Sequence, residues 1–149
     1  MKADSEGLGG QPGRGRDFME SLVAVCAIMA CADGDVRPSE CRSISSYIAT
    51  EPTLEDLDAD AVNQLLEDYV RAIQDEGQSA KIKLSGKIMQ FCGDKPRALA
   101  LMQFAYRVMI SDHDIHEQER KEFRRLCLSL NLDPDVIFGN LSAATKHPF

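Results

Sequence analysis

The segment from Leu22 to Ala32 is apolar on almost every face of a helix, and this limits where it can lie in a fold. A helix over about residues 18–32, capped by Asp17, would carry Phe18 and Met29 on one face and further apolar residues on the others. A helix that is apolar all round has to be enclosed by other elements. The sequence therefore predicts a central helix with the remaining chain packed around it.

The rest of the chain also shows the periodicity of helices, and no segment alternates as a half-buried strand does. Further helices are predicted from Pro38 to the Glu51-Pro52 pair, over about 59–76, over about 79–92, between Asp94 and Asp112, over about 117–130, and from Asp133-Pro134 onward. The predicted fold class is all-α, a compact bundle of about seven helices.

Length and composition favour one domain of a soluble protein. Residues 1–16 contain five glycines and one proline, which indicates a flexible N-terminal tail before a single helical domain over 17–149. The net charge of −7 argues against a nucleic-acid partner, because phosphate backbones require stripes of Lys and Arg. Five cysteines without a CxxC pair favour reduced, mostly buried thiols over disulfides or a thiolate zinc site.

A basic pair before an apolar run gives the N-terminal region some likeness to a secretory signal. Arg14 and Arg16 precede the run that ends in Ala30-Cys31-Ala32, which has the pattern of a cleavage site. Asp17 and Glu20 interrupt this arrangement, and the run is much shorter than the roughly 20 residues that span a bilayer. We therefore expect a cytoplasmic protein without direct membrane insertion.

Two acidic turns repeat one pattern, in which a small residue is followed by Asp, any residue, Asp, Val or Ile, three further residues and Glu. The first turn covers residues 32–40 and the second covers 111–119. Each follows a long apolar helix and precedes an amphipathic helix that contains a cysteine, Cys41 or Cys127. The repeat predicts an internal duplication with approximate two-fold symmetry, helix–acidic turn–helix twice.

The carboxylates of these turns are candidate ligands for one divalent cation. The candidate residues are Asp33, Asp35, Glu40, Asp112, Asp114 and Glu119. Each turn resembles only the second half of an EF-hand loop, since apolar residues stand where that loop has its first oxygen ligands. Two half-sites brought together by the symmetry would bind a hard cation through oxygen atoms. Alternatively, the two Glu cap helices and the Asp bond turn amides.

The sequence resembles the TerB family of tellurite-resistance proteins over about residues 17–141. The matching segments are Phe18-Met19-Glu20, residues 23–27, the turn 33–36 with Glu40, Ser111-Asp112 with Glu119, and residues 128–138. The second turn departs from the usual Asp-Gly of the family, because it carries His113.

This resemblance implies an all-helical, cytoplasmic protein of the stress response. It implies a non-enzymatic binding or scaffold module with protein partners that include membrane-associated Ter components. It also implies a divalent-metal site on the acidic residues and no catalytic activity.

Two other functions remain open on the sequence alone. The first is an enzyme acting on an oxyanion, either through metal-activated water near His113 and His116 or through the thiol of Cys41. No nucleophile motif or phosphate-binding loop supports it. The second is a metal-free helical adaptor, for which Lys81, Lys83 and Lys87 form either an interaction surface or a solvated helix face.

Overall fold

The computed structural model describes residues 3–34, 36–51, 57–111 and 115–138, with side chains from Gly15 onward except that of Asp33. The described residues form helices and no strands. The elements are α1 (Ala3–Ala30), the 3-10 turn η1 (Cys31–Asp33), α2 (Pro38–Ala49), α3 (Ala59–Glu76), α4 (Gln78–Met89), α5 (Lys95–Ile110) and α6 (Glu117–Ser129). Residues 134–138 begin one further helix. The all-α prediction is confirmed for the described chain.

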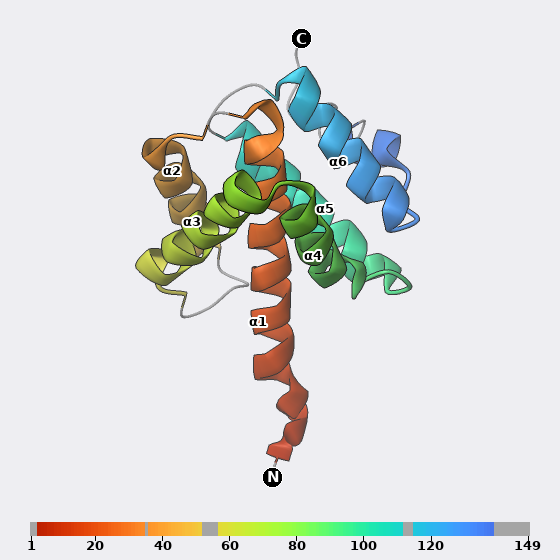
Figure 1. The fold of residues 1–149 in the computed structure, drawn as a ribbon. Coiled ribbons are helices and arrows are strands. Elements are labelled where there is room, and N and C mark those ends of the chain that lie inside the picture. Colours follow the sequence, from red (N-terminus) through yellow and green to blue (C-terminus); the bar gives the residue numbers. More distant parts are fainter. Residues whose placement is uncertain (1–2, 35, 52–56, 112–114, 139–149) are drawn as a thin grey trace.

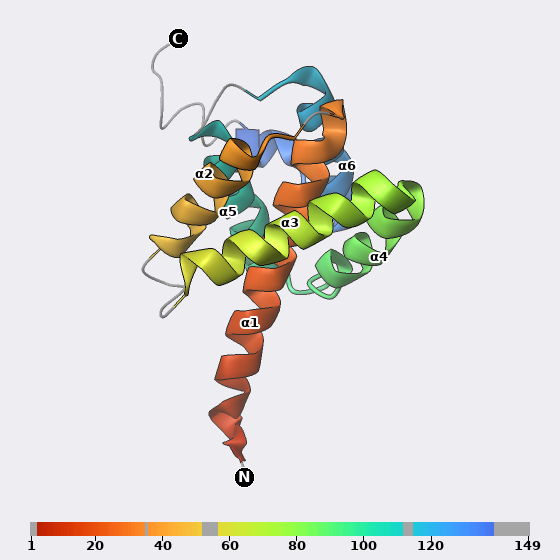
Figure 2. The same ribbon diagram turned by 60° about the vertical axis from the view of Figure 1, so that its left-hand side comes forward.

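Helix α1 forms the axis of the bundle. Every residue from Ser21 to Ala30 is buried, with at most 2% of each residue exposed. Helices α3, α4, α5 and α6 all contact α1, so the apolar faces predicted from the sequence each meet a neighbour. Figures 1 and 2 show the C-terminal half of α1 enclosed by the other helices and its N-terminal half extending away from them. The prediction of a central helix is confirmed.

The N-terminal boundary of α1 differs from the sequence prediction. The helix begins at Ala3, so Asp17 lies inside it and does not act as the predicted N-cap. One reason is that Arg16 pairs with Glu20 one turn later (Nε–Oε2 3.2 Å), a contact that favours helix at this point. The side chains before Gly15 lie outside the described part of the chain, so a flexible tail over 1–16 stays a prediction.

Helix boundaries elsewhere follow local signals that the sequence carries. Asp94 caps α5, because its Oδ1 accepts the backbone N–H of Arg97 at 3.3 Å. Gly34 ends η1 with a φ of 86°, a backbone conformation that glycine adopts without the cost other residues bear. Asp133 accepts the backbone N–H of Asp135 at 3.0 Å, which confirms the predicted helix start at Asp133-Pro134.

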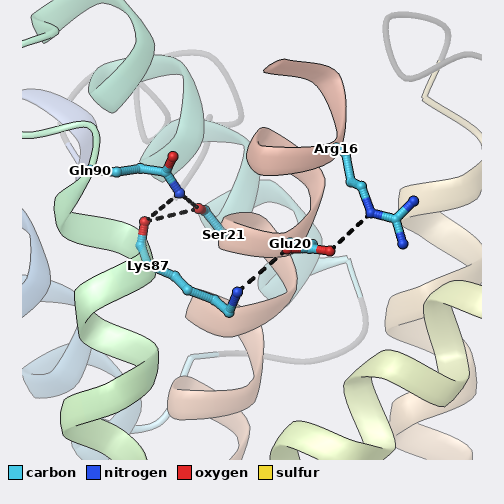
Figure 3. A network of polar contacts seen from close by, with 5 residues as sticks. All are labelled: Arg16, Glu20, Ser21, Lys87 and Gln90. Atoms are coloured by element: carbon cyan, nitrogen blue, oxygen red, sulfur yellow. Dashed lines mark hydrogen bonds and ion pairs between the residues drawn. The ribbon is translucent and has the colours of Figure 1, made fainter. Parts of the chain in front are cut away.

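Helix α4 is fastened to α1 by a small polar network (Figure 3). The hydroxyl of Ser21, which is fully buried, donates to the backbone carbonyl of Lys87 at 3.2 Å. The amide of Gln90 donates to Ser21 Oγ at 3.2 Å and to the same carbonyl at 2.8 Å. Glu20 pairs with both Lys87 and Arg16. The only buried polar residue on the enclosed part of α1 thus has its hydrogen bonds satisfied.

An aromatic cluster holds the start of the last helix against α5 and α6. The ring centroids of Tyr106, Phe123 and Phe138 lie 5.1–5.4 Å apart. The guanidinium groups of Arg120 and Arg124 lie over the ring of Phe138 at 5.0 and 5.4 Å from its centroid. Aromatic and cation–π contacts of this kind each contribute roughly 0.5–1.5 kcal/mol beyond burial.

Among the described residues, none of the helices is both long enough and apolar enough to cross a membrane. The central helix is apolar only over its enclosed half. This agrees with the expectation that the run before the first acidic turn is a core helix.

Because α1 is enclosed, shortening a buried side chain on α1 should lower the free energy of unfolding far more than shortening an exposed one on α4. Met29→Ala removes a fully buried side chain and should lower the free energy of unfolding by about 2–5 kcal/mol. Ile82→Ala removes a side chain that is 64% exposed on α4 and should change it by less than about 0.5 kcal/mol. Urea unfolding of the two variants measures the difference. Similar losses for both would contradict a core centred on α1.

Candidate functional site

The described parts of the two acidic turns lie at the same end of the bundle. The first turn begins in η1, and η1 contacts α6, the helix that follows the second turn. Figures 1 and 2 both show the C-terminal end of α1 beside the start of α6. This arrangement agrees with the hypothesis of adjoining turns, although the internal duplication itself stays a prediction.

Four of the six candidate metal ligands cannot be placed as side chains. Asp35, Asp112 and Asp114 lie outside the described residues, and Asp33 is placed only by its backbone, at the end of η1. Within the part of the chain that the structure describes, no three His, Cys, Asp or Glu side chains group in a way that would hold a metal ion. The shared cation site therefore stays a prediction about the Asp residues.

Glu40 and Glu119 occupy equivalent positions, each at the third residue of its helix. Glu40 Oε1 accepts the backbone N–H of Arg37 at 3.1 Å, and Glu119 Oε1 accepts that of His116 at 2.9 Å. The capping residues Arg37 and His116 share an extended backbone. Both Glu thus fulfil the capping role that the sequence left open, and each carboxylate lies where the helix dipole favours negative charge.

The two caps differ in their burial. Glu119 is only 2% exposed, whereas Glu40 is half-buried. A buried carboxylate is costly unless it is hydrogen-bonded, so the contacts of Glu119 matter more for stability than those of Glu40. The start of α6, which follows the second turn, is therefore held by a carboxylate inside the protein.

In the described part of the chain none of the five cysteines forms a disulfide, and three of them are buried, as the sequence predicted for most. Burial raises the pKa of Cys26 and of Cys127 to about 12. The pKa of Cys41 is also raised, first by burial and then by the carboxylates of Glu67 and Glu40. A raised pKa leaves less of the reactive thiolate, which disfavours Cys41 as a nucleophile. Cys92 alone is exposed.

The lysine cluster on α4 connects helices. Lys81 pairs with Glu122 of α6 at 2.9 Å, Lys83 with Glu76 of α3 at 3.8 Å, and Lys87 with Glu20 of α1 at 3.4 Å. The Lys81–Glu122 pair is mostly shielded, with about a fifth of each side chain exposed. Each lysine thus has a carboxylate partner on a different helix, a feature that neither sequence interpretation of this cluster foresaw.

A cavity beside the first acidic turn also escaped the sequence analysis. It has a volume of about 260 Å³ and lies between the start of α2 and the second half of α3. Its charged and polar lining comes from Arg37, Glu67, Arg71 and Gln74. On α3 these residues are spaced by three or four positions and so share one helix face. In a sequence, a helix face with charged and apolar residues looks like ordinary helix surface. The cavity forms only because α2 packs against this face of α3.

Because Glu119 is more buried than Glu40, its removal should lower the free energy of unfolding by a larger amount. Glu119→Ala should lower the free energy of unfolding by about 1.5–3 kcal/mol, because it removes a charge-assisted hydrogen bond inside the protein. Glu40→Ala should cost about 0.5–1.5 kcal/mol, since water can replace part of its contact. Urea unfolding in the presence of EDTA measures both losses. Glu119→Gln keeps an acceptor oxygen and should lose less than the alanine variant.

The cysteine environments predict an order of alkylation. With iodoacetamide at mildly alkaline pH, Cys92 should react first and Cys26 and Cys127 last, with Cys41 well behind Cys92. Mass spectrometry of timed digests gives the order, and Cys92→Ser identifies the first site. If Cys41 reacted first in the folded protein, the thiol-dependent enzyme would regain support.

Comparison with known proteins identifies the family. No curated protein and no solved structure matches the chain significantly. A family model described as "Tellurite resistance protein TerB" matches residues 19–137, which contain the enclosed part of the central helix, both acidic turns and the start of the last helix. This range covers most of the chain and agrees with the resemblance seen in the sequence. The chain belongs to the TerB tellurite-resistance family.

Proposed function

We propose that this TerB-family protein is a non-enzymatic binding module whose two acidic turns together bind one divalent cation. The observation that carries the proposal is the contact between η1 and α6, which brings the ends of the two turns to one region of the surface. Asp33, Asp35, Asp112 and Asp114 supply oxygen ligands in this proposal, as Ca²⁺ and Mg²⁺ prefer. Glu40 and Glu119 hold the two helix starts in place and add negative charge.

The charge of the chain supports a cation at this location. The sequence segments 32–40 and 111–120 contain four Asp and three Glu. The basic residues and histidines in the same segments are Arg37, His113, His116 and Arg120. Carboxylates held close together repel one another, and a bound cation removes that repulsion. Cation binding would therefore tie η1 to the start of α6 more firmly.

The partners in this proposal are proteins, including the membrane-associated Ter components that the family resemblance implies. A bound cation would fix the relative position of the two turns and so create one defined surface for a partner. The metal-free adaptor is the second possibility, in which the same surface binds without any ion. The two possibilities differ in whether binding persists in EDTA.

Thermal unfolding with and without divalent cations tests the cation site. At about 100 times its dissociation constant, a cation should stabilise the protein by about 2.7 kcal/mol, which corresponds to a rise in Tm of roughly 5–10 °C. Ca²⁺, Mg²⁺, Mn²⁺ and Zn²⁺ are tested separately. Asp33→Asn together with Asp112→Asn should abolish the rise, because the amide keeps the size of the side chain but not its charge.

Asp75→Asn is the matched control, since Asp75 is an exposed carboxylate near the end of α3 and outside both turns. It should keep the full rise in Tm. If none of the four cations changes the Tm of the wild-type protein, the cation site is wrong, and a metal-free adaptor remains. If the Asp75 variant loses the response as well, the effect comes from general surface charge.

A further inference from the structure

The cavity beside the first acidic turn combines an apolar floor with a charged rim. Val70 of α3 and Cys41 of α2 are buried and form part of the floor, and Val36 and Pro38 contribute the adjoining wall. Arg37 and Arg71 are exposed at the rim, and Glu67 is half-buried beside them. A concave apolar surface with a few convergent polar groups is the usual form of a small-molecule site.

The polar groups of the rim have little to bind within the protein. Among the described residues, the guanidinium of Arg37 and the carboxylate of Glu67 have no ion-pair partner, and the amide of Gln74 makes no hydrogen bond. Arg71 pairs only with Asp68, an exposed neighbour on its own helix at 3.3 Å. These four groups therefore retain hydrogen-bonding capacity for a ligand.

The size of the cavity favours a small ligand. Its volume of about 260 Å³ lies just below the range of roughly 300–1,000 Å³ that holds drug-sized molecules. A second hollow of about 380 Å³ is lined by Cys31, Gly34, Ile73 and Gln74, so it shares Gln74 with the first. The buried side chain of Ile73 gives this second hollow an apolar surface, suited to a short aliphatic group.

The charges of the rim have both signs. Two guanidinium groups suit a carboxylate, because an arginine donates two parallel N–H bonds to it. Glu67 would repel an anion without a compensating positive charge, but it suits an ammonium group, together with the carbonyl of Gln74. The carboxylate of Glu67 also raises the pKa of Cys41, so its charge acts directly on the floor of the cavity.

We propose that this cavity binds a small zwitterion that carries a carboxylate and an ammonium group on a short aliphatic body, of which a free aliphatic amino acid is the simplest form. Arg37 and Arg71 bind the carboxylate, Glu67 and Gln74 bind the ammonium group, and the aliphatic body lies over Val70 toward Ile73. This site uses none of the proposed cation ligands, so it is independent of the function proposed above.

Three probes of the same shape test the assignment of charges. L-leucine carries both groups, 4-methylpentanoate lacks the ammonium group, and 3-methylbutylamine lacks the carboxylate. Each is titrated into the ¹⁵N-labelled full chain in EDTA, up to about 10 mM, while backbone amide shifts are followed. We expect L-leucine to shift the backbone amides of residues 36–37, 39–41 and 67–74 in a saturable way. The other two probes should bind at least about tenfold more weakly, because each loses one set of charge-assisted bonds.

Substitutions at the rim then identify the contacts. Arg71→Gln and Glu67→Gln should each weaken L-leucine binding about tenfold or more, and neither side chain supports the core, so both variants should stay folded. Lys83→Gln is the matched control, an exposed cation on α4 away from the cavity, and should leave binding unchanged.

Three results would overturn the proposal. The first is the absence of saturable shifts with L-leucine, and the second is equal binding of 4-methylpentanoate, which would indicate a plain anion site. The third is that Arg71→Gln and Glu67→Gln both bind L-leucine as tightly as the wild-type protein does. Because EDTA is present throughout, a failure here leaves the cation site untouched, and a failure of the cation titrations leaves this proposal standing.

Discussion

The structure depends on the burial of one helix on all of its faces. From Ser21 to Ala30, α1 presents no residue to solvent, so four neighbouring helices have to be present together before its apolar surface is removed from water. Each fully buried Val, Leu, Ile or Met contributes roughly 1.5–3 kcal/mol relative to exposure. Loss of any one neighbour would expose part of this surface, which makes the bundle cooperative around its axis.

Polar contacts then determine the orientation of α4 relative to α1 and the other helices. The three lysines of α4 reach carboxylates on α1, α3 and α6, and Ser21 binds the carbonyl of Lys87 inside the same interface. Surface ion pairs contribute little each, typically below about 1 kcal/mol, so their main effect here is to select one orientation of α4. The shielded Lys81–Glu122 pair is the strongest candidate for a larger effect, because water screens it less.

Sequence analysis predicted the features that depend on local chemistry. The apolar pattern of residues 22–32 requires a central helix, and Asp94 and Asp133 mark helix starts because their carboxylates accept nearby backbone N–H groups. Capping by Glu40 and Glu119 was also predicted as one of two roles. The start of α1 was placed too late, since a capping-box spacing at Asp17 looks the same whether or not helix precedes it.

Features that depend on which helices meet were not predictable from one sequence. The partners of the α4 lysines lie on three other helices, and the cavity at Arg37 and Arg71 exists only because α2 packs against α3. The shared metal site was predicted from the repeat of the acidic turns. The structure describes the contact of η1 with α6, and the ligand geometry of the Asp residues stays a prediction.

Helix α1 continues directly into η1, so the packing of the core also determines where η1 lies. In an α-helix, each added residue turns the chain by about 100° and advances it by about 1.5 Å. Because the buried segment holds α1 in one rotational setting, the same packing also sets where the backbone of η1 meets α6. If one residue of the core segment were deleted, the helix could keep its apolar faces aligned or keep η1 against α6, but not both.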